Sequence, residues 1–194
     1  MKLTSQFWTA PNQLTLLRLL FVPFILMSVL DGHWGWALTL FIAAGVSDGL
    51  DGLLARALHQ KTTLGEYLDP IADKLLLSSL FLTMSFVHQI PWRYTILVFS
   101  RDLSLLVVSA VVYNTTSVRD FSPSIFGKVN TFFQLTAVFF VMVGRVHPDF
   151  WIRLCRSVSL YATFAFTLIS GVHYILLMGR RLHAANHKDA ESAS

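Results

Sequence analysis

The sequence has 194 residues, of which 54% are hydrophobic and only 13% are charged, and its formal net charge is +4. A soluble domain carries nearer a quarter charged residues, so this chain has too few charges to cover a water-facing surface. We therefore expect a lipid bilayer around it, with anionic headgroups rather than nucleic acid as partners of its basic residues. The single cysteine, Cys155, excludes an intrachain disulfide and a cysteine-rich metal site.

Six apolar stretches follow one another along the chain, and each is long enough, or nearly so, to cross a hydrocarbon core of about 30 Å. They cover Leu14–Leu30, Trp34–Ala57, Pro70–His88, Trp92–Tyr113, Ile125–Gly144 and Val158–Met178. The connections between them are short and polar, and the tail is expected to fray from about residue 183. The sequence thus predicts an all-α polytopic membrane protein, with six transmembrane helices in a single domain over residues 1–194.

The distribution of Lys and Arg at the span ends predicts the orientation in the membrane. With six spans, both termini share a side with the second and fourth connections. That side carries nine basic residues: Lys2, Arg56, Lys61, Lys74, Arg119, Lys128, Arg180, Arg181 and Lys188. The other side carries four: Arg93, Arg145, Arg153 and Arg156. The bias places both termini in the cytoplasm of a multi-pass protein of the cell (inner) membrane.

Two arginines, Arg18 and Arg101, lie inside apolar stretches and are not part of this comparison. Arg18 also argues against a cleaved signal peptide, because it interrupts the first apolar run and no small-residue cleavage site follows. We expect its long side chain to snorkel to the membrane interface.

Acidic residues are concentrated in one short part of the sequence. Of the 11 acidic residues, five lie between Asp48 and Asp73. Asp48 and Asp51 are three residues apart, so both project from one face of a helix. Asp69 and Asp73 are four residues apart and share a face in the same way. The link Lys61–Gly65 is short enough to reverse the chain, so we expect the two acidic faces to meet.

Four converging carboxylates would repel one another unless a cation lay between them. Hard oxygen ligands select a hard divalent cation, Mg²⁺ or Mn²⁺, and a pair of such ions suits phosphoryl transfer. Small residues in the same segment predict close approach by a bulky ligand. Gly49, Gly52 and Ala55 flatten one helix, and Gly65 is expected to open the turn. The polar site is expected to face the cytoplasm.

Two other interpretations fit parts of this pattern. A single Asp before an apolar helix usually caps the helix N-terminus. Carboxylates at membrane depth also serve ion-coupled transporters. The combination of four carboxylates at these spacings, with Gly and Arg between them, favours the metal site over both.

The spaced motif in this segment resembles the signature of the CDP-alcohol phosphatidyltransferase family. Residues 48–56 read DGLDGLLAR, and Gly65, Asp69 and Asp73 follow at the family's spacing. Residues 11–18, PNQLTLLR, resemble the entry to the family's first membrane helix. The pair Arg101-Asp102 and residues 127–134, GKVNTFFQ, are similar to the subgroup of phosphatidylglycerophosphate synthases and eukaryotic-type cardiolipin synthases.

This resemblance implies a six-helix membrane enzyme of phospholipid synthesis that forms homodimers. It implies that CDP-diacylglycerol donates a phosphatidyl group to a glycerol-containing acceptor and that CMP is released. The metal ligands would be Asp48, Asp51, Asp69 and Asp73, and Asp73 would also be the general base. The donor pocket would be shaped by Asn12, Thr15, Gly52, Ala55, Arg56 and Gly65.

The acceptor is glycerol 3-phosphate or phosphatidylglycerol, and the residues leave this choice open. The Arg-Asp pair is more typical of cardiolipin synthases, whereas phosphatidylglycerophosphate synthases more often have Arg-Glu. Both acceptors carry a phosphate, for which Arg101, Lys128 and Arg119 are candidate ligands. A salt bridge from Arg101 to Asp102, and headgroup contacts for Lys128 and Arg119, are the structural alternatives.

Overall fold

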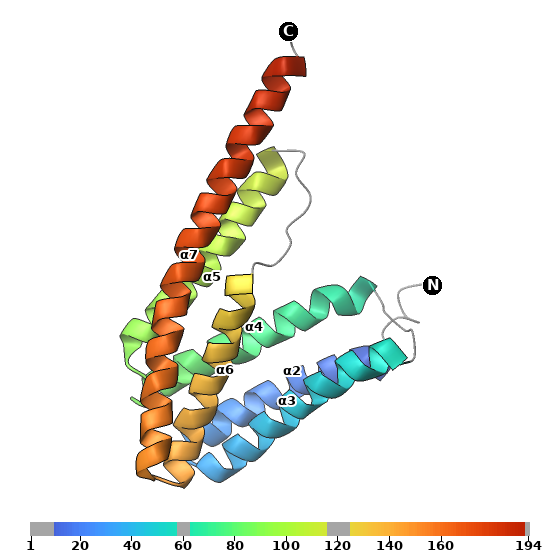
Figure 1. Ribbon diagram of the computed structural model, residues 1–194. Coiled ribbons are helices and arrows are strands. Elements are labelled where there is room, and N and C mark those ends of the chain that lie inside the picture. Colours follow the sequence, from blue (N-terminus) through green and yellow to red (C-terminus); the bar gives the residue numbers. More distant parts are fainter. Residues whose placement is uncertain (1–9, 58–62, 116–124, 193–194) are drawn as a thin grey trace. The chain divides into compact units, whose positions relative to one another are not determined.

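The computed structural model describes the backbone of residues 10–57, 63–115 and 125–192, and side chains mainly in 15–49, 72–105 and 127–173. The described backbone forms six α-helices, which confirms the all-α prediction (Figure 1). They are α2 (Ala10–Leu30), α3 (Trp34–Ala57), α4 (Thr63–Phe86), α5 (Trp92–Thr115), α6 (Ile125–Val146) and α7 (Phe150–Ser192).

Helix α4 begins earlier than the apolar pattern predicts. It starts at Thr63 rather than Pro70 and continues through that proline. Gly65, which we expected to open the turn before this helix, therefore lies in the first turn of α4. Leu64 and Glu66 favour helix, and Thr63 and Gly65 are tolerated in its first turn, so hydrophobicity alone does not mark where the helix begins.

Helix α7 is longer than predicted at both ends. It begins at Phe150 rather than Val158, because the polar residues Arg153 and Arg156 break the apolar run but favour helix. The helix continues to Ser192, and fraying of the tail from about residue 183 stays a prediction. This tail contains neither Gly nor Pro after Gly179, and its alanines support helix.

Two helices end in the same hydrogen-bonded cap, and each cap sets a tight connection. At the end of α2, Gly32 has a φ of 74°, its N–H donates to the Val29 carbonyl (3.2 Å), and the His33 N–H donates to the Ser28 carbonyl (2.8 Å). At the end of α4, His88 takes the equivalent left-handed position, with a φ of 57°. This cap satisfies the last carbonyls of each helix and lets the next helix turn back.

The helices divide into two compact units. The first contains Met1–Pro91 with Val138–Arg156, and in it α2 packs against both α3 and α4. The second contains Trp92–Ala137 with Ser157–Ser194. In this unit the ring of Tyr94 in α5 meets that of Phe164 in α7 at 5.9 Å, and Phe133 of α6 stacks on Phe166 at 4.8 Å.

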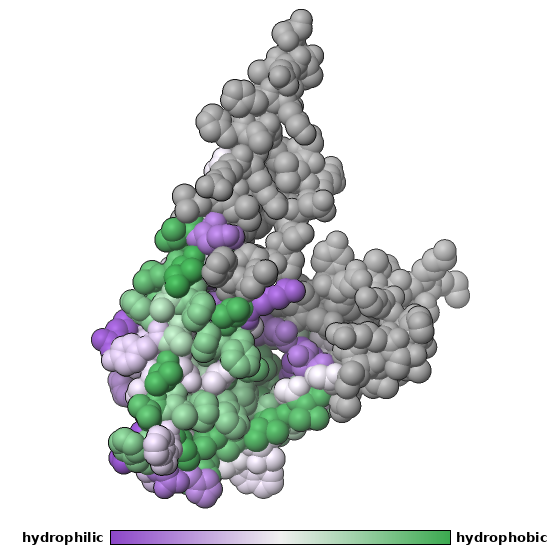
Figure 2. Space-filling view, in the orientation of Figure 1, coloured by the Kyte–Doolittle hydropathy of each residue, from purple (hydrophilic) through white to green (hydrophobic). Residues whose placement is uncertain are grey.

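Polar and apolar side chains are distributed as expected for a protein in lipid. Many large apolar side chains are exposed. Trp36 and Trp151, which lie near helix ends, have exposed fractions of 69% and 71%. The coloured face in Figure 2 is accordingly mostly apolar. Buried polar side chains lie inside, and most are hydroxyls or amides: Thr15, Arg18, Ser47, Thr83, Ser85, Thr95, Asn130, Gln134, Ser159, Thr163, Thr167 and Ser170. Several hydroxyls donate to the carbonyl four residues earlier, which satisfies them where water is absent.

Length and composition qualify two stretches of the described residues as membrane spans, Gly127–Val146 and Phe150–His173. The apolar part of α2, Thr15–Leu30, is shorter. The fold therefore contains apolar helices of membrane-crossing length, while the six predicted spans remain a proposal.

Candidate active site

Arg18 joins two acidic residues that the sequence singled out. Its Nη2 lies 2.5 Å from Oδ1 of Asp48, and its Nη1 forms an ion pair with Oδ1 of Asp73. The three residues come from three helices: Arg18 from α2, Asp48 from α3 and Asp73 from α4. The predicted convergence of the two acidic faces is therefore seen for the one carboxylate of each face whose side chain is described.

The packing of α2 explains this convergence. The tight cap at Gly32 reverses the chain, so α3 runs back beside α2 and its last turns reach the first turns of α2. Helix α4 packs against α2 as well, which brings its first half to the same end. A residue early in α2 thus faces residues late in α3 and early in α4.

The prediction that Arg18 snorkels to the interface is wrong. Its side chain is only 1% exposed, whereas those of Asp48 and Asp73 are 52% and 44% exposed. A buried guanidinium requires opposite charges and hydrogen-bond acceptors, and here two carboxylates supply both. A snorkelling arginine would have its guanidinium in water and its aliphatic stem in lipid.

The other motif residues are located by their backbone alone. Asp51 and the donor-pocket candidates Gly52, Ala55 and Arg56 lie on α3, and Asp69 and Gly65 lie on α4. Asn12 lies on α2, and the side chains of all these residues are outside the described part. Thr15, one turn before Arg18 on α2, is buried at 1% exposure. Their assignment to metal and donor stays a prediction.

The described part of the site fits a metal centre. Among the described side chains, no group of three His, Cys, Asp or Glu residues comes together. Asp48 and Asp73 are nevertheless close enough to share one guanidinium, so their oxygens already face a common cation. Carboxylate oxygens are hard ligands of the kind that Mg²⁺ and Mn²⁺ prefer. Their exposed sides leave room for ions and a substrate.

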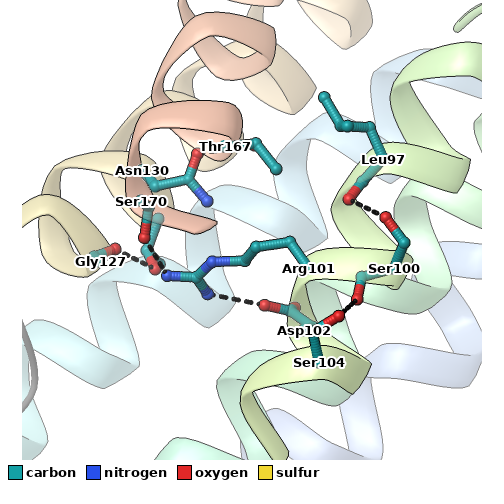
Figure 3. A network of polar contacts seen from close by, with 10 residues as sticks. Leu97, Ser100, Arg101, Asp102, Ser104, Gly127, Asn130, Thr167 and Ser170 are labelled. Carbon is teal, nitrogen blue, oxygen red and sulfur yellow. Dashed lines mark hydrogen bonds and ion pairs between the residues drawn. The ribbon is translucent and has the colours of Figure 1, made fainter. Parts of the chain in front are cut away.

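Arg101 lies in the second unit, in a different network (Figure 3). Its Nη1 donates to Oδ1 of Asp102 (2.8 Å) and its Nη2 to the hydroxyl of Ser170 (2.7 Å). The ion pair with Asp102, the structural alternative considered above, is therefore present. Gly127 of α6 lies close by, because a Cβ at that position would approach Nη2 of Arg101 to 3.3 Å.

Buried hydrogen-bond donors without partners accompany this network. Asn130 of α6 accepts a hydrogen bond from the hydroxyl of Thr167 (2.9 Å), and its buried Nδ2 has no partner. Nε of Arg101 and Nε2 of Gln134 are buried and unpartnered as well. Donors in such positions favour a ligand with acceptor oxygens. Asn130 and Gln134 belong to the motif at residues 127–134, but no role was predicted for them, nor for Thr167 and Ser170.

Lys128 and Arg119 are the remaining candidates for binding the acceptor, and only Lys128 lies in the described part of the chain. Lys128 lies in the first turn of α6 and is exposed. Arg119 lies outside the described residues. The acceptor role of both stays a prediction.

Apolar helices with ionisable groups paired in their interior are typical of integral membrane proteins. The family model described as CDP-alcohol phosphatidyltransferase matches residues 8–169. The chain belongs to this family, and it is therefore an enzyme of phospholipid biosynthesis. Family membership implies CDP-diacylglycerol and an alcohol as substrates, and it removes the ion-coupled transporter considered above.

The chain is also similar to individual members of this family whose names state a reaction. A Mycobacterium tuberculosis protein named "Probable phosphatidylglycerophosphate synthase" is 34% identical over 173 residues, which cover 84% of this chain and 78% of the relative. An Aquifex aeolicus "CDP-diacylglycerol--glycerol-3-phosphate 3-phosphatidyltransferase" is 32% identical, with 86% and 93% covered. The rat "Cardiolipin synthase (CMP-forming)" is 36% identical over 147 residues, which cover 68% of this chain and 49% of that protein.

Proposed function

We propose that this chain transfers the phosphatidyl group of CDP-diacylglycerol to glycerol 3-phosphate, which forms phosphatidylglycerophosphate and releases CMP. The observation that carries the proposal is that Asp48 and Asp73 both contact the guanidinium of Arg18. These two aspartates are the first and last acidic residues of the family motif. The choice of acceptor is supported by the names of the Mycobacterium and Aquifex relatives, which the chain matches over most of both lengths.

The chemistry follows from the carboxylates. We assign Asp48, Asp51, Asp69 and Asp73 as the residues that would hold two divalent ions, Mg²⁺ or Mn²⁺, and such ions would neutralise negative charge on the donor pyrophosphate and on CMP. The acceptor hydroxyl oxygen bonds to the phosphorus that carries diacylglycerol, the bond from that phosphorus to the CMP oxygen breaks, and Asp73 takes the hydroxyl proton. A carboxylate is a weak base for an alcohol, so electrostatic stabilisation carries most of the acceleration.

The donor pocket lies along the motif helices. Gly52 and Gly65 allow the donor to approach the backbone of α3 and α4, and we assign Ala55, Arg56, Asn12 and Thr15 to the same pocket. The acyl chains of the donor remain in the bilayer, where the exposed apolar side chains of the helices meet lipid.

The phosphate of the acceptor requires cations and donors. We assign it to Arg101, Lys128 and Arg119. Two observations support Arg101: its Nε is buried without a partner, and the amide of Asn130 on the neighbouring helix also has an unpartnered donor. A phosphate presents several acceptor oxygens and is matched by such a set of donors.

Phosphatidylglycerol is the second candidate acceptor, with cardiolipin as the product. The feature that favours it is the sequence pair Arg101-Asp102, which is more typical of cardiolipin synthases than of phosphatidylglycerophosphate synthases. The match to the rat protein agrees, although it covers only about half of that protein.

We place all six helices across the membrane, with both termini in the cytoplasm, and we propose a homodimer. The basic residues of the predicted cytoplasmic side support the orientation. Labelling of introduced cysteines in a Cys155→Ser background tests it: a cysteine at the exposed position of His33 should react from outside the cell. Reaction of that position only after permeabilisation would reverse the orientation.

The acceptor is tested with purified enzyme and labelled CDP-diacylglycerol. Glycerol 3-phosphate, phosphatidylglycerol, inositol phosphate and serine are offered separately, and both CMP and the lipid product are measured. Phosphatidylglycerophosphate should form with glycerol 3-phosphate alone. Cardiolipin from phosphatidylglycerol would replace the first candidate by the second, and no CMP with any acceptor would contradict both.

A further inference from the structure

Arg18 contacts Asp48 and Asp73 from the interior of the protein. Arg18 is almost completely buried, at 1% exposure, while about half of each partner carboxylate is exposed. The guanidinium therefore lies on the protein side of Asp48 and Asp73, and their other side is open. A cation placed in this way contacts the carboxylates without closing the open side.

The two terminal nitrogens of Arg18 form a fork that contacts two carboxylates. Each terminal nitrogen contacts Oδ1 of a different carboxylate, and those carboxylates come from different helices. A guanidinium is planar and its donors have fixed directions, so it sets the orientation of both groups at once. A lysine ammonium, which is a compact point charge on a flexible stem, does not define two directions in this way.

Stability alone is a weak reason for a buried arginine at this position. Replacement of a buried ion-pair network by apolar residues is often neutral or stabilising, because desolvation of the charges is costly. Arg18, Asp48 and Asp73 together carry a net charge of −1, so these three residues still attract a cation. The arginine thus orients the carboxylates without cancelling their charge.

We propose that Arg18 is a positioning residue of the metal site. It holds one oxygen of Asp48 and one of Asp73 from the buried side, so that both carboxylates face the divalent ions and the acceptor hydroxyl. This inference rests on the metal site in the proposed function. It extends that function to a residue outside the four-carboxylate motif, on a helix that supplies none of the metal ligands.

Direct measurement of metal binding tests this role. Mn²⁺ affinity is measured by titration calorimetry on purified protein in detergent, without substrate, for wild type, Arg18→Gln and Arg18→Lys. Loss of a residue that orients metal ligands typically weakens binding by about 10–100-fold, which we expect for Arg18→Gln. Arg18→Lys keeps the charge but not the fork, so its affinity should lie between the two.

The matched control is Arg145→Gln in the same unit. Arg145 lies over the ring of Trp34 at 5.4 Å, and its removal should leave Mn²⁺ affinity at the wild-type value. Turnover is followed in parallel. Arg18→Gln should lower kcat even at saturating Mn²⁺, because Asp73 is no longer oriented toward the acceptor hydroxyl.

The outcomes separate this inference from the proposed function. Wild-type or tighter Mn²⁺ binding by Arg18→Gln would overturn the inference, and tighter binding would make Arg18 a competitor of the metal. If Arg18→Gln does not fold, Arg18→Lys decides: severalfold weaker binding supports the inference, and unchanged binding overturns it. Absence of Mn²⁺ binding by the wild-type protein would instead contradict the metal site itself.

Discussion

The two arginines inside the apolar stretches differ in exposure and in the charge of their partners: the side chain of Arg18 is 1% exposed and that of Arg101 is 10% exposed. Arg18 contacts Asp48 and Asp73, the latter 55 residues away, and this cluster has a net charge of −1. Arg101 contacts its neighbour Asp102 and the neutral Ser170, so this pair has a net charge of zero and leaves donors unpartnered. The first environment is suited to a further cation, and the second to acceptor oxygens.

This difference predicts which part of the reaction each region controls. Changes around Arg18 should affect metal binding and turnover. Changes around Arg101 should affect the acceptor and leave the metal untouched. Variants in each region test whether metal binding and acceptor binding are separate in this way.

Asp73→Asn should abolish turnover, because the amide neither takes the hydroxyl proton nor carries the charge that the metal site requires. Binding of CDP-diacylglycerol should stay within about tenfold of wild type, roughly 1.4 kcal/mol, since the proton comes from the acceptor. Rates of CMP release and equilibrium binding of the donor measure the two effects. Asp31→Asn, at an exposed position after α2, is the control. Loss of donor binding with loss of turnover would make Asp73 chiefly a metal ligand.

Arg101→Gln should raise the KM for the acceptor by about tenfold, the worth of one charge-assisted hydrogen bond. The KM for CDP-diacylglycerol and the Mn²⁺ affinity should change far less. Arg93→Gln is the matched control on α5, because Arg93 is exposed and lies over the ring of Tyr94 at 5.2 Å. Equal increases in both KM values would show that Arg101 is only a structural ion-pair partner.

Thr167→Val removes the hydroxyl that donates to the buried amide oxygen of Asn130. Hydrogen bonds between membrane helices contribute about 0.6 kcal/mol on average and about 1.7 at most, so a loss in this range is expected. Unfolding in mixed micelles measures it. Thr39→Val is the control, because the Thr39 hydroxyl donates to the Gly35 carbonyl of its own helix. Equal stability of the two variants would mean that the Asn130 contact contributes nothing.

Gly127→Ala should have the smallest effect, about a twofold increase in the acceptor KM, or roughly 0.4 kcal/mol. The added Cβ would lie 3.3 Å from Nη2 of Arg101, so the guanidinium must shift by a few tenths of an ångström. Gly144→Ala on the same helix is the control, since its Cβ would meet Ile152 at an ordinary 3.5 Å. A change of the donor KM instead would place Arg101 near the donor.

The sequence predicted the helical architecture well where apolar runs end at turn residues. The end of α2 coincides with the predicted boundary because Asp31 and Gly32 form a capped turn. The starts of α4 and α7 were predicted too late, because residues before each apolar run extend both helices. Hydrophobicity locates the part of a helix that is apolar, whereas propensity and caps decide where it begins.

The acidic residues of the candidate site could be predicted from the sequence, but the role of Arg18 could not. The spacing of Asp48 from Asp51 and of Asp69 from Asp73 indicated two acidic faces, and the short link between the helices predicted that these faces meet. The partner role of Arg18 depends on α2 packing against both α3 and α4, which no periodicity in the sequence encodes. Asn130 could have been found, since it shares a helix face with Gly127 and Gln134.

We propose that the paired carboxylates make the phosphatidyl transfer of this chain dependent on a divalent cation. The most direct measurement is CMP release from CDP-diacylglycerol with glycerol 3-phosphate while a chelator removes free divalent ions. Activity should be lost in excess chelator and should return when Mg²⁺ or Mn²⁺ is added back. Full activity in excess chelator would contradict the account.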